Sequence, residues 1–542
     1  MSPIMRSLIL ALVAGALLAP AAQASQDQSS IMMDDDLLVY RGPVTAQRAM
    51  TQMKALGVDT IRVTLSWAIT ADKARFTPAE IKKLKGAKAR RAAKKQTRRF
   101  RAASPKTYPV LNWDRYDDLV RLAQTNGLRV YFNITGPGPA WAHEKPPKSQ
   151  RYLRKTYKPK PGAFKQFVTA VGKRYSGSYR DENQSKGVLP RVSFWSLWNE
   201  PNQAGWLSPQ WEKIGGRRIL VSAMLFRKLY QAGYKGLQSS GHGIDTDTVL
   251  LGETAPLGST KTNAKSPPFP SLFLRELACI KQNGSKYTGG AARARGCNNF
   301  GPKLQANGFA HHPYTKNVPT TTQPPAGGLT MANISQLGTL LDDLSSKSGG
   351  KIPADLPLYM TEFGFETNPP DPFNGVPLFS QASFNELGEF LAFSNPRIAS
   401  QAQFLLRDVA PVAGKSPGTK AYWFTYQSGL YFNNSVPKPA VFAYQLPFIV
   451  FPGGNDAATG HQSFSFWGQL RFVPDGTPAN AVIQWRPKGS GGAWDSLGTA
   501  VPVSTRGYFQ TTRVSPVAGP VEWRAAWLTA DGHLGVVSLT SG

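Results

Sequence analysis

Short apolar segments of strand length alternate with longer segments that have the periodicity of amphipathic helices. The helical pattern is clearest at Val44–Leu56, which ends at Gly57, and at Trp113–Thr125, which ends at Asn126-Gly127. Eight apolar segments predict β-strands: Asp36–Tyr40, Asp59–Trp67, Leu128–Ile134, Val192–Trp198, Val249–Gly252, Gly308–His312, Leu358–Glu362 and Ala421–Thr425.

Eight strands that alternate with helices predict an α/β fold, a (β/α)8 TIM barrel over residues 31–452. An open, doubly wound sheet is the alternative with the same alternation. Such sheets often carry a glycine-rich phosphate-binding turn after a strand, but neither a G-x-G-x-x-G motif nor a P-loop follows any of these segments. The sequence therefore favours the barrel.

The pattern changes at about residue 455, after the turn cluster Phe451–Asn455. The remaining segments alternate apolar and polar residues, show no helical period and are separated by glycine and proline. They predict a small C-terminal β-sandwich, an Ig- or fibronectin-like accessory module over residues 455–542. Its predicted strands are Ser463–Phe472, Ala481–Arg486, Arg506–Val514, Val521–Leu528 and Gly535–Leu539.

The first 24 residues have the layout of a secretory signal peptide. Arg6 precedes the apolar run Leu8–Leu18, and Ala22-Gln23-Ala24 gives the small-x-small pattern of a cleavage site. An uncleaved anchor helix is the alternative, but the run is shorter than the roughly 20 apolar residues of a bilayer span. We therefore expect residues 1–24 to be cleaved and the protein to be secreted.

The composition excludes intrinsic disorder for most of the chain. Of 542 residues, 41% are hydrophobic, which is enough to form a large core. Lys and Arg number 63 against 33 Asp and Glu, so the formal net charge is +30. A charge of this size favours an anionic partner, which is a nucleic acid, an anionic membrane surface or an acidic polymer.

Nearly two thirds of the excess positive charge lies in two segments. Residues 73–106 contain 14 Lys and Arg and one acidic residue, and residues 144–160 contain 7 and one. Each segment follows a predicted strand and precedes a helix, so a right-handed barrel places both in long basic loops on its catalytic face. The loops either wall a groove that attracts an anionic ligand or form a solvated surface without a role in binding.

Cys279 and Cys297 are the two cysteines of the chain, and 18 positions separate them. In an oxidising compartment they can close one disulfide across a long loop, and a metal site would need more ligands nearby. Two unpaired buried thiols are the alternative, and the sequence favours the disulfide.

Two glutamates follow buried strands directly. Glu200 lies in Trp198-Asn199-Glu200-Pro201-Asn202, and Glu362 lies in Thr361-Glu362-Phe363-Gly364. In a barrel, both lie at the carboxyl ends of strands and face each other across the mouth. Glycoside hydrolysis needs such a pair, a carboxylic acid for the leaving oxygen and a carboxylate at the anomeric carbon. The alternative is that each glutamate caps a helix or pairs with one of the many Lys and Arg residues.

These two motifs resemble the acid/base and nucleophile motifs of clan A glycoside hydrolases, which are retaining (β/α)8 enzymes, and within the clan they resemble families 39 and 5. The resemblance covers residues 31–450 and implies that Glu200 is the general acid/base and Glu362 the nucleophile. It also implies that Asn199 holds the sugar 2-hydroxyl. The third strand ends Phe132–Thr135, without the polar pair common in family 5, which leaves the family open.

The resemblance adds four residues that bind substrate or support the carboxylates: Arg62, His312, Tyr314 and Trp423. Arg62 on the second strand keeps the nucleophile ionised, Tyr314 donates a hydrogen bond to it, and His312 lines the sugar site. Trp423, on the predicted eighth strand, is either a platform under the sugar or a core residue. His311 points the other way by the two-residue period of a strand, so we expect a structural role for it.

The sequence therefore predicts a secreted, monomeric, retaining O-glycosyl hydrolase that cleaves a polysaccharide or oligosaccharide, with an anionic or cell-wall glycan as one candidate, and that needs no cofactor or metal. An inactive carbohydrate-binding protein on the same barrel is the alternative. A nucleic-acid-binding protein is disfavoured, because aromatic residues do not lie among the basic runs. The tryptophans of the C-terminal module are either core or a sugar-stacking surface: Trp467, Trp485, Trp494, Trp523 and Trp527.

Overall fold

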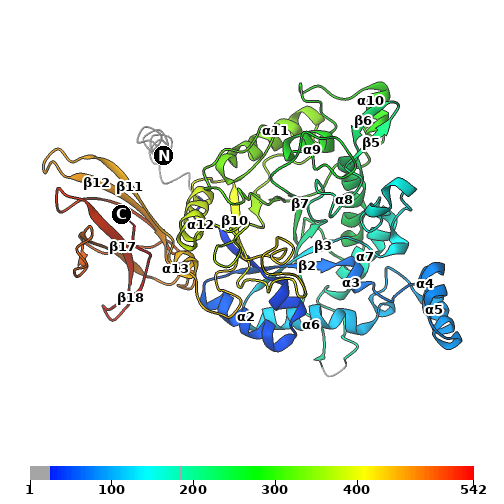
Figure 1. Cartoon of the computed structure of the whole chain (residues 1–542), viewed down its shortest axis with the longest axis horizontal. Helices are drawn as coiled ribbons and strands as arrows, with labels where there is room; N and C mark the ends of the chain where they lie inside the picture. Colours follow the sequence, from blue (N-terminus) through cyan, green and yellow to red (C-terminus); the bar gives the residue numbers. More distant parts are fainter. Residues whose placement is uncertain (1–24, 184–185, 542) are drawn as a thin grey trace.

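A computed structural model describes residues 25–183 and 186–541 of the chain (Figure 1). The predicted signal peptide, residues 1–24, lies outside the described residues. Eight parallel strands close into a barrel, which confirms the predicted (β/α)8 fold. In barrel order, starting from the first strand, they are β1 (Ser29–Met33), β10 (Ile398–Phe404), β9 (Leu358–Met360), β8 (Gly308–His311), β7 (Thr248–Thr254), β4 (Phe194–Leu197), β3 (Arg129–Thr135) and β2 (Thr60–Ser66).

One principal helix follows each barrel strand and covers the outside of the barrel (Figure 1). Within residues 25–183 and 186–541, no helix is long and apolar enough to cross a membrane. The principal helices are α2 (Pro43–Ala55), α6 (Val110–Thr125), α7 (Pro161–Arg174), α8 (Ser222–Gln238), α9 (Pro270–Ala278), α11 (Ser335–Ser348), α12 (Leu378–Phe393) and α13 (Pro439–Gln445). Shorter elements lie in the connections: η2 (Asp36–Tyr40), α3 (Trp67–Thr70), α4 (Pro78–Lys83), α5 (Ala87–Arg99), η3 (Pro105–Thr107), η4 (Ala140–Ala142), η5 (Lys148–Leu153), β5 (Trp211–Ile214), β6 (Arg217–Leu220), α10 (Gly289–Ala294) and η7 (Met331–Asn333).

The interior of the barrel has an apolar layer and a polar layer. Side chains of β2 alternate between the two sides of the barrel wall, so that Ile61 and Val63 pack in the main hydrophobic core while Arg62, between them, bonds to carboxylates of other strands. A separate cluster of Tyr131, Phe194, Leu250, Ala310 and Tyr359 comes from five neighbouring strands and forms the apolar layer. Charged groups therefore gather at the carboxyl ends of the strands.

The sequence prediction is wrong for the first strand. The first strand is β1, and the segment Asp36–Tyr40 forms the short helix η2. Leu37, Leu38 and Val39 are all buried in η2. Three consecutive buried apolar residues suit a fully buried strand and one turn of a helix equally well, so the pattern did not separate the two.

The prediction is also wrong for the eighth strand. β10 is that strand and pairs with both β1 and β9, whereas Ala421–Thr425 forms turns and bends in a later loop. β10 was missed because its buried side chains include the polar residues Ser400, Gln401 and Gln403, which interrupt the apolar pattern.

The C-terminal residues form antiparallel sheets, as predicted. One sheet contains β11, β12 and β16, and the other contains β14, β13, β17 and β18, with β15 paired to β13. β11 begins at Phe448, before residue 455. The strands are β11 (Phe448–Asn455), β12 (Gln462–Gln469), β13 (Asn480–Pro487), β14 (Asp495–Ser496), β15 (Val501–Pro502), β16 (Tyr508–Val514), β17 (Val521–Leu528) and β18 (Leu534–Val537).

These sheets pack against the barrel beside α12 and α13 (Figure 1). Trp467 of β12 packs edge-on against Phe390 and at a tilt against Phe393 of α12, with ring centroids 5.4 and 5.5 Å apart. Ion pairs join the same surfaces, including Arg471 to Glu389 at 2.9 Å. The interface between the sheets and the barrel has an apolar centre, and charged residues at this interface form ion pairs. These contacts hold the sheets on the barrel.

The tryptophans of the sheets mostly serve in packing. Trp467 and Trp523 are 1% exposed, and Trp485 and Trp527 are partly buried against the core of the sheets. Trp494 lies under the guanidinium groups of Arg486 and Arg524, each 4.5 Å from the ring centroid. The packing role favours the core alternative over a sugar-stacking surface.

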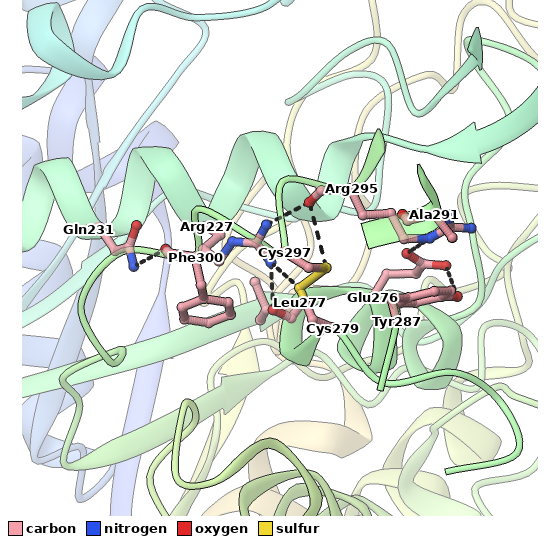
Figure 2. Close-up of a disulfide and its surroundings, with 10 residues drawn as sticks. All are labelled: Arg227, Gln231, Glu276, Leu277, Cys279, Tyr287, Ala291, Arg295, Cys297 and Phe300. Carbon is pink, nitrogen blue, oxygen red and sulfur yellow. Dashed lines mark hydrogen bonds and ion pairs between the residues drawn. A yellow bond between two sulfur atoms is a disulfide. The ribbon is translucent and has the colours of Figure 1, made fainter. Parts of the chain in front are cut away.

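Cys279 and Cys297 form a disulfide, as the sequence favoured (Figure 2). Arg227 of α8 lies beside the disulfide and donates hydrogen bonds to the carbonyls of Leu277 and Arg295, at 3.0 and 2.7 Å. The disulfide and Arg227 together tie the loop after α9 to α8.

Replacing both cysteines by serine is expected to lower the free energy of unfolding by about 3 kcal/mol, because the disulfide closes a loop of 18 residues and restricts the unfolded chain. Denaturation in urea measures the loss. Reduced wild-type protein should match the double variant, and a reductant should not change the variant further. Equal stability of oxidised wild type and double variant would contradict the prediction.

Candidate active site

The two predicted glutamates meet at the carboxyl ends of the barrel strands. Glu200 follows β4 and Glu362 follows β9. A carboxylate oxygen of each, together with a ring nitrogen of His312, lie within 4.8 Å of one another. The side chains of Glu200 and Glu362 are 21% and 11% exposed, so both reach solvent from a largely buried position. The structure therefore brings together three of the predicted site residues.

The backbone around Glu200 has an uncommon conformation. Trp198, Glu200 and Glu253 have positive φ angles of 82°, 36° and 53°, a region that residues other than glycine rarely adopt. Backbone hydrogen bonds hold the arrangement, since the amide of Glu200 donates to the carbonyl of Glu253 at 2.8 Å and that of Trp198 to the carbonyl of Ile134 at 2.9 Å. Two acidic side chains from neighbouring strands are thereby fixed at the same level of the barrel.

Arg62 connects three site residues from the centre of the barrel. Its guanidinium is fully buried and donates to Glu362 Oε1 at 2.8 Å, to Asn199 Oδ1 at 2.8 Å and to Glu253 Oε2 at 3.1 Å. The ion pair fixes the position of the Glu362 carboxylate, and the bond to Asn199 orients that amide. Arg62 and Asn199 thus lie where the sequence predicted them.

His312 and Tyr314 follow β8 and complete the surroundings of the two glutamates. Tyr314 donates to Glu362 Oε2 at 3.1 Å. The ring of His312 bonds to Glu200 Oε1 through Nδ1 at 3.0 Å and to Glu253 Oε2 through Nε2 at 2.7 Å. Burial lowers the pKa of His312, but the charge of Glu362 and the bonds to Glu200 and Glu253 outweigh burial and raise the pKa to about 10. His312 is therefore an imidazolium at neutral pH.

Glu253 was missed by the sequence analysis. It lies near the end of β7, at a bulge in the pairing with β8, and is 1% exposed. Burial raises the pKa of Glu253, but Arg62 and His312 outweigh burial and hold the pKa well below its usual range. The signal was present, because Val249–Glu253 is an apolar strand that delivers one glutamate, as at Glu200. The groups that donate to its carboxylate are Arg62, Tyr131, Ser196, His312 and Thr361.

The charges of this network leave room for one further proton. Glu200, Glu253 and Glu362 carry three negative charges when ionised, and Arg62 and His312 carry two positive charges. Binding of one proton makes the network neutral, and a neutral network is favoured when a ligand excludes water. Glu200 is the most exposed carboxylate of the three.

The three clustered donor atoms of Glu200, His312 and Glu362 also have the spacing of a metal site. His312 does not suit that role, because both ring nitrogens already bond to carboxylates and its raised pKa keeps both protonated. A protonated ring nitrogen has no lone pair for a metal ion. The cluster is better described as a proton-sharing network.

A cavity of about 870 Å³ opens above the network, at the carboxyl ends of the strands. Its wall contains aromatic side chains on which a ring-shaped ligand can stack. Its charged lining is acidic, with one lysine, Lys316. The aromatic residues are Tyr40, Trp206, Tyr314, Phe404 and Tyr426, and the acidic residues are Asp35, Asp36, Glu200, Glu362 and Glu366.

Two of the acidic residues that line the cavity have raised pKa values. Burial raises the pKa of Asp35 to about 6, and burial together with the charge of Asp371 raises the pKa of Glu366 to about 7. Asp35 accepts one hydrogen bond from the amide of Thr64, at 3.1 Å. Neither carboxylate forms an ion pair among the described residues, and the raised pKa values mean that Glu366 and then Asp35 become neutral as the pH falls through about 7 and about 6.

The two basic segments do not wall this cavity, and the hypothesis that they do is wrong. Among the described residues, the cavity lining contains no residue between Ser66 and Gly136 and none between Pro137 and Asn199 in the sequence. Residues 73–106 and 144–160 thus contribute nothing to it. They connect β2 to α6 and β3 to α7, so they are strand-to-helix connections, as predicted, and the first of them folds into α4 and α5 at the edge of the barrel (Figure 1).

Trp423 does not lie at the end of a strand and is not among the residues that line the cavity. Its indole Nε1 donates to the carbonyl of Pro417 at 3.0 Å, within the loop after β10. The platform prediction depended on an eighth strand in the wrong place. Tyr426 from the same loop lines the cavity instead.

His311 is directed away from the network, as the strand period predicted. Its ring bonds to the hydroxyl of Thr254 at 2.7 Å and to the carbonyl of Leu329 at 2.9 Å. Burial lowers the pKa of His311 to about 3, so the ring is neutral. Its role in joining β7 and β8 to the following loop is structural.

No family model and no curated protein matches the chain. Solved structures similar to it include a family 39 glycoside hydrolase from Bacteroides cellulosilyticus WH2, with 13% identity, 91% of this chain and 82% of that chain covered, and a TM-score of 0.44. A GH39 β-xylosidase from Caulobacter crescentus is 13% identical, with 92% and 98% covered and a TM-score of 0.45. A GH5_18 protein from Bifidobacterium longum subsp. longum is 10% identical, with 77% of each chain covered and a TM-score of 0.43.

Proposed function

We propose that the protein is a retaining glycoside hydrolase in which Glu362 is the nucleophile and Glu200 the general acid/base. One observation carries the proposal, the approach of the two carboxylates within 4.8 Å inside an open cavity. Retaining enzymes have carboxyl groups about 5 to 5.5 Å apart, whereas inverting enzymes keep about 6.5 to 9.5 Å for a water molecule. The disulfide supports the predicted export to an oxidising compartment.

In the first step, a Glu362 oxygen attacks the anomeric carbon while Glu200 gives its proton to the leaving glycosidic oxygen. The bond between the anomeric carbon and the leaving oxygen breaks, and a glycosyl ester of Glu362 forms. Arg62 and Tyr314 each bond one oxygen of Glu362, which fixes the direction of attack. Asn199, oriented by Arg62, is placed to bond a sugar hydroxyl.

In the second step, Glu200 removes a proton from water, and the water oxygen attacks the anomeric carbon. The ester bond breaks, Glu362 leaves as a carboxylate, and the product keeps the configuration of the substrate. Glu200 regains its proton in this step, and His312 at 3.0 Å keeps its carboxyl in place throughout. Each residue is thus returned to its starting state.

The lining of the cavity supports a neutral or amine-bearing sugar as the bound unit. Five acidic side chains and one lysine line the cavity, and a uronic acid would meet like charges there. Trp206 and Tyr426 offer aromatic faces for the apolar faces of sugar rings. Within the proposal, these two residues take the stacking role first expected of Trp423.

The test is the anomeric configuration of the first-formed product on aryl glycosides and oligosaccharides of neutral sugars, amino sugars and uronic acids. Proton NMR during the first turnovers is expected to show the anomeric signal with the configuration of the substrate. An inverted first product would exclude the retaining mechanism. Glycan binding by the intact protein without turnover of any substrate would support the inactive carbohydrate-binding alternative instead.

A further inference from the structure

The strongest feature outside the cavity is the helical hairpin of α4 and α5, Pro78 to Arg99, here called the basic hairpin. It contains ten Lys and Arg, and every one of them is exposed. Its one acidic residue, Glu80, is engaged in a capping box with Thr77 at the start of α4. Among the described residues, none of the ten basic side chains forms an ion pair, whereas the helices α6, α7, α9, α11 and α12 all carry ion pairs.

The basic hairpin is a fixed part of the fold. Gln96 of α5 donates to the carbonyls of Ala74 and Thr107, at 3.2 and 3.1 Å. Ala93 is buried on the inner face of α5, and Phe100 at its end packs on Trp141 with ring centroids 5.5 Å apart. The basic side chains of α5 are therefore presented on a framework that does not depend on a ligand.

The arrangement of charge in α5 is unfavourable for the protein alone. Lys88, Arg91, Lys95 and Arg98 lie opposite Ala93, three or four residues apart, so each repels its neighbours. A helix brings such residues about 5.4 Å apart along its axis, which is close to the length of one sugar unit. An extended polyanion laid along α5 would pair with all four and relieve the repulsion.

The second basic segment continues this surface. The guanidinium of Arg75 stacks on Trp141 at 5.1 Å, and Lys160 donates to the carbonyl of Trp141 at 3.1 Å. Residues 73–106 and 144–160 thus meet at Trp141. Figure 1 shows α4 and α5 at the edge of the barrel opposite the C-terminal sheets.

We propose that the basic hairpin is a docking surface for an acidic polysaccharide, separate from the catalytic cavity. A helix that binds a membrane surface inserts apolar side chains, but the apolar side chains Ile81 and Leu84 are half-buried here. Surfaces for single-stranded nucleic acid stack bases on exposed aromatic residues, and the hairpin has none. The choice of a polysaccharide over other polyanions rests on the proposed function, since the same chain carries a site for cleaving glycans.

The acidic cavity and the basic docking surface have separate tasks, which are cleavage of the glycan and attachment to it. Anionic units of a polymer or of a cell surface are held at the rim, while a neutral or amine-bearing unit enters the cavity. The docking surface raises the local concentration of glycan without taking part in bond cleavage.

The experiment compares binding of the full chain to polygalacturonate, dextran, duplex DNA and phosphatidylglycerol vesicles at low salt. The test variant is K88Q/R91Q/K95Q/R98Q, and the matched control is K54Q/K303Q/K415Q/K488Q, which removes four exposed lysines that form no ion pair among the described residues. The test variant is expected to bind polygalacturonate at least about tenfold more weakly than wild type, and the control within about twofold of it. Added salt should remove the difference.

Equal losses in the two variants would overturn the proposal, because only net charge would then matter. Tighter binding of duplex DNA or of the vesicles than of polygalacturonate, lost in the test variant, would overturn the choice of partner. Far-ultraviolet circular dichroism verifies that the test variant keeps its helices. Binding is read without turnover, so a protein that binds polygalacturonate through the hairpin but cleaves no glycoside would contradict only the proposed function.

Discussion

Replacing Glu362 by glutamine is expected to lower kcat/KM for any glycoside that the protein cleaves by about 10⁴-fold or more. Glutamine keeps the size of the side chain and one acceptor for Arg62, but it cannot form the glycosyl ester. The partners Arg62 and Tyr314 remain in place, so the loss reports the chemistry and not the binding of the sugar. Steady-state kinetics with an aryl glycoside measure it.

The two glutamates can be distinguished by chemical rescue. In Glu362→Ala, azide can occupy the vacated space and attack the anomeric carbon directly, so the glycosyl azide should have the configuration opposite to that of the substrate. In Glu200→Ala, the ester still forms when the leaving group is a good one, and azide then gives the retained configuration. The opposite pairing of products would mean that the two roles are exchanged.

The matched control is Glu366→Gln. Glu366 lines the same cavity but contacts neither Arg62 nor His312 among the described hydrogen bonds and ion pairs. Its replacement should change kcat/KM by less than about tenfold. A loss in Glu366→Gln as large as that in Glu362→Gln would indicate that activity depends on the total negative charge of the cavity and not on Glu362 in particular, and the nucleophile assignment would fail.

The sequence was informative where one local pattern had one physical meaning. An apolar strand followed by Asn199-Glu200-Pro201 can deliver the glutamate only at the strand end, and the barrel then brings that end to the shared mouth. The same reasoning placed Glu362 at a strand end, and the resemblance to clan A predicted that Arg62 lies near it. Alternation of strand and helix is a strong signal because it repeats eight times.

The errors came from contacts between residues that are distant in sequence. β10 places Gln403 in the barrel, where its amide bonds to the carbonyl of Ser428, and no local pattern shows that a buried glutamine will have a partner. Trp423 was assigned to the site because the strand before it was misplaced. The position of the basic segments relative to the cavity depends on loop conformation, which the charge of the residues does not determine.

Glu253 shows a further limit of the sequence. Its strand was predicted, but its role arises from donors on β2, β3 and β4 and in the segments after β8 and β9, which only the closed barrel brings together. Burying a carboxylate without such donors costs free energy. From the sequence alone, the side chain of Glu253 is therefore expected to face solvent. The network is thus a property of the fold and not of any one segment.

Replacing Glu253 by glutamine is expected to lower the free energy of unfolding by about 3 to 5 kcal/mol, the usual loss when one partner of a buried ion pair is removed. Arg62 and His312 would keep their charges without a full counter-charge, and the new amide would direct a donor at other donors. Because Glu253 touches Arg62 and His312 and not the cavity, it acts as a positioning residue. Urea denaturation measures the loss.

The matched control for the stability loss is Glu276→Gln. Glu276 is also buried and also pairs with an arginine, Arg295 at 2.7 Å, but it lies beside the disulfide and has no histidine partner (Figure 2). Both variants should therefore lose stability, and only Glu253→Gln should lower kcat strongly. If Glu276→Gln lowered kcat as much as Glu253→Gln does, general destabilisation would explain the loss of activity in both variants.

The pH dependence of stability separates a role in the charge network from simple packing. The pKa of His312 rises from 6.5 to about 10 on folding, so His312 contributes stability that is fully present below pH 6.5 and is lost as the pH rises through about 10. Wild-type stability should therefore fall across this window. Glu253→Gln removes one of the charges that raise the pKa of His312, so its stability should fall less steeply there, and Glu276→Gln should keep the wild-type slope. An unchanged slope in Glu253→Gln would show that Glu253 does not support the charge of His312, and the loss of activity in that variant would then need another cause.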